Sequence, residues 1–157
     1  MTPSARILVV DDDDSIRKIL SIILRQSGYL VDTAASGEEA IAKSDANFYN
    51  LALIDVRLPD IEGTKLLTLM KDTTPRMMKV ILTGYPLLEN ALQAINRGVD
   101  GYLAKPVNTT QLLKTVSQLL ERQAKENRFT EEQLKSYVET QFKKGRTIRR
   151  ELTKKTS

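Results

Sequence analysis

Acidic side chains follow two apolar segments of the sequence, a placement that could support chemistry. Asp11 and Asp12 come directly after residues 6–10, and Asp55 comes directly after residues 51–54. Short runs of aliphatic and β-branched residues are typical of strands buried on both faces of a parallel sheet. Because ligands of open α/β sheets bind at the carboxyl ends of the strands, these carboxylates are candidates for a functional site.

Composition restricts the chemistry that is open to these carboxylates. The chain of 157 residues contains no Cys and no His, which excludes disulfides, thiolate metal sites and histidine bases. Three carboxylates brought close together would raise one another's pKa values, and a divalent cation would relieve their repulsion. With only oxygen ligands available, Mg²⁺ or Mn²⁺ is the expected metal. Asp13 and Asp14 need no metal, since an acidic turn and a helix N-cap at Asp14 account for them.

Thr83 and Lys105 end two further predicted strands and should lie at the same edge of the sheet. Alone, a strand-end Thr or Lys is more often structural or solvated than functional. Beside the carboxylates, a hydroxyl donor and an amine suit phosphoryl transfer to a carboxylate, because the cation and the amine neutralise phosphoryl oxygens.

Strands and helices alternate strictly along the chain. Five strands are predicted, at residues 6–10, 29–34, 51–54, 79–82 and 101–104. A helix is predicted after each, at residues 14–27, 36–47, 64–71, 87–96 and from Thr109 or Thr110 onward. This pattern predicts an α/β fold, a flavodoxin-like (βα)5 doubly wound parallel sheet with strand order 2-1-3-4-5. The core face of the first helix is expected to comprise Ile16, Ile19, Leu20, Ile23 and Leu24, whereas Ile22 lies off that face.

The formal charge is spread unevenly between two predicted parts of the chain. Residues 1–122 hold 14 Lys/Arg and 15 Asp/Glu, a net charge of −1, whereas residues 123–157 hold 10 and 5, a net charge of +5. We expect the first part to be the globular domain and the second a basic helical extension, too short for a separate DNA-binding domain. Direct nucleic-acid binding is not expected. No apolar stretch reaches the length of a membrane span and no signal peptide is apparent, so a cytoplasmic location and no membrane contact are expected.

The basic extension carries the pattern of one extra C-terminal helix. Thr130 with Gln133 fits a capping box, and Gly145 fits a C-cap, which predicts a helix over residues 130–144. Residues 122–128 also fit an extension of the fifth helix. The apolar face of the extra helix needs a surface to cover it.

Four motifs together resemble the response-regulator receiver domain of two-component signalling. They are residues 7–14, 52–63, 80–84 and 101–106, and the resemblance covers roughly residues 5–121. It implies a switch that accepts a phosphoryl group from a histidine kinase and that catalyses only its own phosphorylation and dephosphorylation, so that it is not an enzyme acting on other molecules.

The resemblance also implies roles for individual residues. Asp55 would be the phospho-acceptor and a ligand of Mg²⁺. Asp12 and the backbone carbonyl of Arg57 would be further ligands, and Asp11 would lie nearby or act through water. Thr83 would be the switch hydroxyl.

Four further residues receive roles in the same way. Lys105 would pair with the phosphoryl group and would precede a cis peptide bond at Pro106, while Tyr102 would be the aromatic switch. Arg57 and Tyr85 occupy positions that control the access of water in this family, so we expect slow hydrolysis of the phosphoryl group.

Several partners and functions follow from the resemblance. The expected partners are a sensor histidine kinase or phosphotransfer protein, for which Ile22 is a weak contact candidate, and a downstream protein target. A homodimer is expected through the face of the fourth helix, fifth strand and fifth helix, or through the C-terminal helix. The alternative function is a receiver that modulates transcription through a DNA-binding partner or its basic tail. A third candidate function is a phosphohydrolase with a carboxylate nucleophile. Such an enzyme needs a second carboxylate two residues after the nucleophile, and at that position the chain has Arg57.

Overall fold

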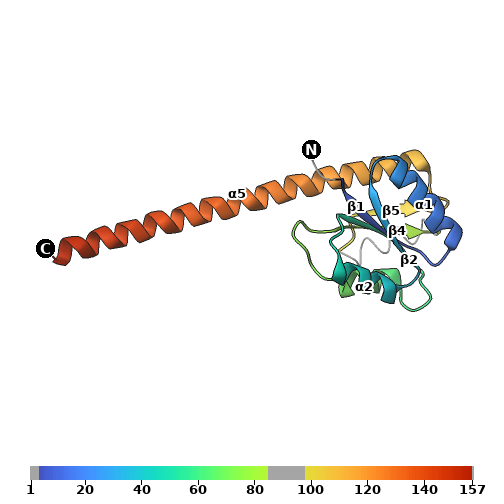
Figure 1. Cartoon of the computed structure of the whole chain (residues 1–157), viewed down its shortest axis with the longest axis horizontal. Coiled ribbons are helices and arrows are strands. Elements are labelled where there is room, and N and C mark those ends of the chain that lie inside the picture. Colours follow the sequence, from blue (N-terminus) through green and yellow to red (C-terminus); the bar gives the residue numbers. More distant parts are fainter. Residues whose placement is uncertain (1–3, 85–97, 157) are drawn as a thin grey trace. The chain divides into compact units, whose positions relative to one another are not determined.

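The computed structural model describes residues 4–84 and 98–156, and strands alternate with helices from residue 6 to residue 83 (Figure 1). The predicted fourth helix, residues 87–96, lies outside the described residues. The elements are β1 (Arg6–Val10), α1 (Asp14–Gln26), β2 (Leu30–Ala34), α2 (Gly37–Ala46), β3 (Leu51–Asp55), α3 (Gly63–Leu69), β4 (Met78–Thr83), β5 (Gly101–Ala104) and α5 (Thr109–Thr156).

The strands form one parallel sheet in the order β2-β1-β3-β4-β5, which confirms the predicted flavodoxin-like arrangement. Val10 pairs with Ile54 across β1 and β3, and Thr83 pairs with Ala104 across β4 and β5. This register places the residues that follow β1, β3, β4 and β5 at one edge of the sheet. The strand order reverses between β1 and β3, where ligands of doubly wound sheets bind.

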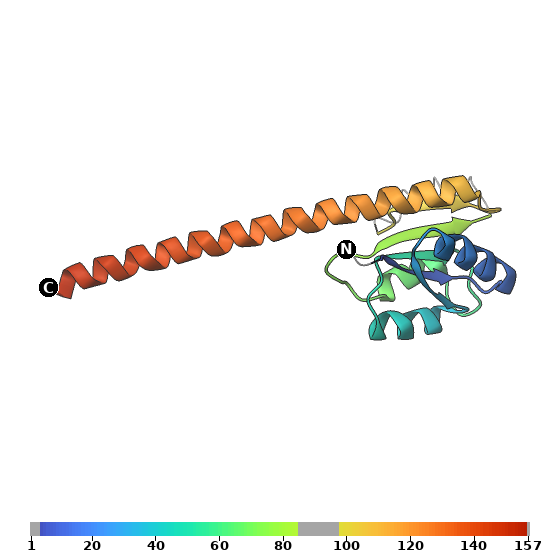
Figure 2. The ribbon, with the colours of Figure 1, turned by 45° about the horizontal axis from the view of Figure 1, so that its top comes forward.

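Helices cover both faces of the sheet and divide the core into two layers (Figures 1 and 2). On one face, α1 and the first turns of α5 contribute buried side chains such as Leu24 and Val116. On the other face, α2 and α3 contribute Ala40 and Leu66. All five residues of β3 are buried, as expected for the strand in the middle of a doubly covered sheet.

The start and the buried side of α1 differ from the prediction. The N-cap is Asp13 rather than Asp14, because the Asp13 side chain accepts hydrogen bonds from the N–H groups of Ser15 and Ile16. Ile19, which was expected in the core, is 57% exposed. The buried side is centred between Leu20 and Leu24, and at 100° per residue Ile19 lies about 120° away from that centre. Ile22 is exposed, as predicted.

Helix α5 is continuous from Thr109 to Thr156, so residues 130–144 are helical as predicted. The predicted break before this segment is wrong. The Thr130 hydroxyl donates to the carbonyl of Glu126, which is a mid-helix contact, and Gly145 lies inside the helix. The residues before Thr130 have good helix propensity, and one interior Gly costs only about 1 kcal/mol.

The chain divides into two compact units, residues 1–123 and residues 124–157, which are described separately. Among the residues that the structure describes, no helix is both long and apolar enough to cross a membrane.

Gln123 closes the first unit with a buried polar contact. Its side-chain amide donates to the carbonyl of Asn50 at 2.8 Å and to that of Arg76 at 2.7 Å, and its oxygen accepts from the Asn50 side chain at 3.1 Å. Because Gln123 is only 4% exposed, water cannot replace these partners. The contact therefore holds α5 to the segments that precede β3 and β4.

We predict that Gln123→Leu lowers the free energy of unfolding by about 3 kcal/mol, because it leaves buried acceptors and a donor without partners. Urea denaturation followed by circular dichroism measures the change. The control is Gln118→Leu on the exposed side of the same helix, which should change stability by less than about 0.5 kcal/mol. Equal effects of the two substitutions would contradict the role assigned to Gln123.

Candidate functional site

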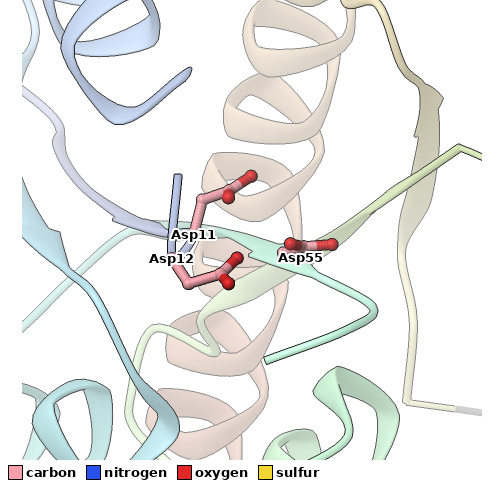
Figure 3. Close-up of side chains that lie close together, drawn as sticks. All are labelled: Asp11, Asp12 and Asp55. Atoms are coloured by element: carbon pink, nitrogen blue, oxygen red, sulfur yellow. The ribbon is translucent and has the colours of Figure 1, made fainter. Parts of the chain in front are cut away.

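Three carboxylates converge where the strand order reverses (Figure 3). Asp11 and Asp12 follow β1, Asp55 ends β3, and one oxygen from each lies within 4.8 Å of the others. Asp11 and Asp55 are buried and Asp12 is exposed, so the cluster opens to solvent on one side. The predicted convergence is thus present, and the cluster could hold a metal ion with oxygen ligands.

Backbone N–H groups orient the two buried carboxylates. One oxygen of Asp11 accepts from the N–H of Asp13 at 2.9 Å, and one oxygen of Asp55 accepts from the N–H of Arg57 at 3.2 Å. The N–H of Asp11 itself donates to the carbonyl of Ala34 at the end of β2. Each carboxylate therefore presents its second oxygen toward the centre of the site.

Lys105 joins the second oxygens of these two carboxylates. Its ammonium lies 2.8 Å from Oδ2 of Asp11 and 3.2 Å from Oδ2 of Asp55. The backbone fixes the position of this lysine, because the N–H of Lys105 donates to the carbonyl of Thr83 at 2.7 Å. The Lys105–Pro106 peptide bond is cis, as the resemblance implied. The ammonium therefore compensates both buried negative charges.

Burial and charge shift the pKa values of this group. Burial raises the pKa of the Asp55 carboxyl, and the negative charge of Asp11 raises it further. The Arg57 N–H and the Lys105 ammonium lower this pKa, but they offset the increase only in part. Burial alone would lower the pKa of Lys105, but its hydrogen bond and ion pair with Asp11, and those with Asp55, raise it above the ordinary value. Lys105 is consequently held as a cation.

The loop after Asp55 is tightly folded against β3. The N–H of Val56 donates to the carbonyl of Leu82, and the N–H of Gly63 donates back to the carbonyl of Val56. Arg57 and Glu62 form a bridge across the loop. A Cβ at Gly63 would overlap the carbonyl oxygen of Asp55, so this position requires glycine.

Asp60 ties the same loop to α2, a contact that the sequence analysis missed. Its two carboxylate oxygens accept from the N–H groups of Gly37 and Glu38, each at 2.9 Å. These hydrogen bonds hold the pKa of Asp60 below its usual value. Sequence pattern could not reveal the contact, because Asp60 caps a helix that begins 23 residues earlier in the chain.

The remaining candidate residues lie at the same edge of the sheet or outside the described residues. Thr83 ends β4 and is fully buried, and Tyr102 is a half-buried residue of β5. Arg57 is exposed beside Asp55. Tyr85 lies outside the described residues.

These features define a class of protein: a doubly wound parallel sheet that carries an acidic cluster and a lysine at its switch point. The sequence profile of the response regulator receiver domain matches residues 7–117. The chain therefore belongs to the response regulator receiver domain family, which is a family of signalling domains.

Individual relatives agree with this assignment. The chain is 32% identical over 120 residues to the transcriptional regulatory protein GlrR of Escherichia coli, a match that covers 76% of this chain and 27% of GlrR. A CheY-like receiver domain protein of Methanospirillum hungatei is similar in structure, with 44% identity, a TM-score of 0.72, and coverage of 79% of this chain and 99% of that chain.

A third relative is the response regulator TrrA of Thermotoga maritima, whose structure is described as a complex with Mg(2+)-BeF. It is 34% identical, with a TM-score of 0.65 and coverage of 73% of this chain and 98% of that chain. The match to GlrR spans only about a quarter of that relative's length.

We predict that Asp55→Asn raises the free energy of unfolding at pH 7 in EDTA. Because the folded-state pKa of Asp55 lies above the ordinary value of 3.8, the folded protein binds more protons between those two pKa values, and stability falls as pH rises through this window. The increase in the free energy of unfolding caused by Asp55→Asn should therefore become smaller as pH falls toward 3.8. Chemical denaturation at several pH values measures it.

Asp32→Asn is the control for this experiment, because it should change the free energy of unfolding in the opposite direction. Burial opposes the shift, but hydrogen bonds from Tyr49 at 2.6 Å and Arg6 at 2.7 Å lower the pKa of Asp32. The stability that the ionised Asp32 contributes is present above its ordinary pKa and is lost as pH falls through its lowered pKa in the folded protein. Asp32→Asn should therefore lower the free energy of unfolding at pH 7. If both variants were destabilised at pH 7, the assigned environment of Asp55 would be incorrect.

Proposed function

We propose that the chain is a phosphorylation-dependent signalling switch in which Asp55 accepts a phosphoryl group from a histidine kinase. The observation that carries this proposal is the Lys105 ammonium held against both Asp11 and Asp55 beside an open acidic cluster. A carboxylate oxygen of Asp55 would attack phosphorus while the bond to the kinase imidazole breaks. Lys105 would then pair with the phosphoryl oxygens.

The proposed metal is Mg²⁺, with Mn²⁺ as a substitute. Asp11, Asp12 and Asp55 would hold it together with the carbonyl of Arg57, a donor set made only of oxygen atoms. When bound, the cation would supply further positive charge for the transferred group. The description of the TrrA structure as a complex with Mg(2+)-BeF supports this choice.

The phosphorylated state would be reported by residues at the ends of β4 and β5. The buried hydroxyl of Thr83 would turn toward the phosphoryl group, and Tyr102 would move inward. The face formed by the predicted fourth helix, β5 and α5 would then change its contacts with a downstream protein. Arg57, together with Tyr85, would restrict the access of water and slow hydrolysis.

The proposed organisation is a receiver domain over residues 1–122 and a basic helical extension over residues 123–157. The partners would be a sensor histidine kinase or phosphotransfer protein and a protein target. Because histidine kinases obtain their phosphoryl group from ATP, which is a cytoplasmic nucleotide, the proposed reaction would take place in the cytoplasm. A second candidate function is the modulation of transcription through a DNA-binding partner, since curated relatives are named transcriptional regulatory proteins.

We predict that Asp55→Ala abolishes covalent labelling by radioactive acetyl phosphate with Mg²⁺, because the attacking carboxylate is removed. Mass spectrometry of the intact protein provides a second readout. The control is Asp45→Ala on the exposed surface of α2, which should be labelled like the unmodified chain. Stoichiometric labelling of Asp55→Ala would exclude Asp55 as the acceptor.

We predict that Asp60→Ala weakens Mg²⁺ binding about fivefold, equivalent to about 1 kcal/mol, because the loop that carries the Arg57 carbonyl loses its tether to α2. Isothermal titration calorimetry measures the affinity. Ser36→Ala is the matched control, since it removes the cap that Ser36 gives to Glu39 of the same helix without touching the loop. Equal losses in both variants would mean that only helix stability is involved.

A further inference from the structure

The unit of residues 124–157 exposes a continuous apolar face. Leu134 is 60% exposed, Tyr137 63%, Val138 47% and Phe142 65%. At 100° per residue these side chains span about 140° of the helix surface, which makes them one stripe. Exposed apolar surface of this kind marks an interaction site.

A hollow interrupts this stripe at Gly145. It has a volume of about 540 Å³, and no atom lies within 4 Å of the place where a Cβ of Gly145 would stand. The hollow is lined by Tyr137, Val138, Gln141, Phe142, Gly145, Arg146 and Arg149. Glycine is unfavourable inside a helix by about 1 kcal/mol, and here it leaves room for a large side chain from another molecule.

The charges of the helix are divided along its length. Residues 124–140 contain three Lys/Arg and four Asp/Glu, a net charge of −1, whereas residues 141–157 contain seven and one, a net charge of +6. Two such helices in parallel would place the two strongly basic halves side by side. In antiparallel order, each basic half faces the slightly acidic half of the other copy.

The spacing of the stripe fits such a pair. Leu134, Val138, Gln141 and Gly145 follow one another at steps of four, three and four residues, which is the seam of a coiled coil. When Leu134 is set opposite the second copy's Gly145, Val138 lies opposite the second copy's Gln141. This alignment also runs residue 124 against residue 155, so the helices overlap along nearly the whole unit.

Charged residues beside the seam agree with this register. Glu131 and Arg149 each lie about 60° from Leu134 on the same side of the helix. In the antiparallel alignment, Glu131 of one copy falls opposite residue 148 of the other, one position from Arg149, so these two charged residues are neighbours across the pair and the contact occurs twice. Both residues are exposed in the structure and accessible to a second copy.

We propose that residues 124–157 pair antiparallel with a second copy of the chain, Leu134 of each entering the hollow over Gly145 of the other. A second copy supplies the side chain that matches the hollow and the charges that match each half. A membrane surface would bury the Gln141 amide without a partner, and nucleic acid would leave the apolar stripe in water. This dimer is independent of phosphorylation at Asp55.

Sedimentation equilibrium of the full chain tests the pairing. The unmodified chain should be a dimer that dissociates more readily at high salt, and Leu134→Glu should weaken association at least tenfold. Phe129→Glu is the matched control, because Phe129 is 61% exposed but lies about 140° from Leu134 on the helix, so the dimer should persist. Circular dichroism checks that both variants remain helical. A monomer at all concentrations overturns the proposal, as would equal effects of both variants.

Cross-linking tests the orientation, and the absence of Cys from the chain makes it unambiguous. Leu134→Cys and Gly145→Cys proteins are mixed and oxidised mildly. Antiparallel pairing should give mainly the mixed disulfide between the two variants. Parallel pairing would instead join each variant to itself, and that result would overturn the proposal. Binding of anionic vesicles or duplex DNA without self-association would also overturn it.

Discussion

The Lys105 ammonium between two buried carboxylates is the interaction on which the rest of the site depends. Asp11 is fully buried and Asp55 is 6% exposed, and both lie near the same point. Buried charges cost several kcal/mol each unless they are paired, so their repulsion must be compensated. The compensating cation follows β5, whereas Asp11 follows β1 and Asp55 ends β3. Only the assembled sheet brings these three strand ends together, so the site exists only in the folded protein.

The loop after Asp55 is held from two sides. Gly63 allows it to pack against the carbonyl of Asp55, while Asp60 fastens it to the first turn of α2. The Asp60 carboxylate also lies at the positive end of that helix, where negative charge is favourable. A backbone carbonyl that is to serve as a metal ligand needs such support, because it has no side-chain rotamers to adjust. The tether thus links the chemistry at β3 to the layer formed by α2 and α3.

The second unit depends on a different balance, since a single helix has no core of its own. Its stability as a helix comes from propensity and from whatever covers its apolar stripe. The stripe, the hollow over Gly145 and the division of charge along the helix are complementary to an inverted copy of themselves. Such self-complementarity is the requirement for a symmetric dimer, in which each contact occurs twice.

The sequence by itself determined the strand order, the convergence of Asp11, Asp12 and Asp55, and the placement of Lys105 at the same edge, because these follow from local apolar patterns and the rules of parallel sheets. The tertiary structure alone decided which side of α1 is buried, leaving Ile19 exposed. It also decided that Asp60 caps a distant helix. These features depend on packing and on contacts between residues far apart in the chain, and a local pattern carries no record of either.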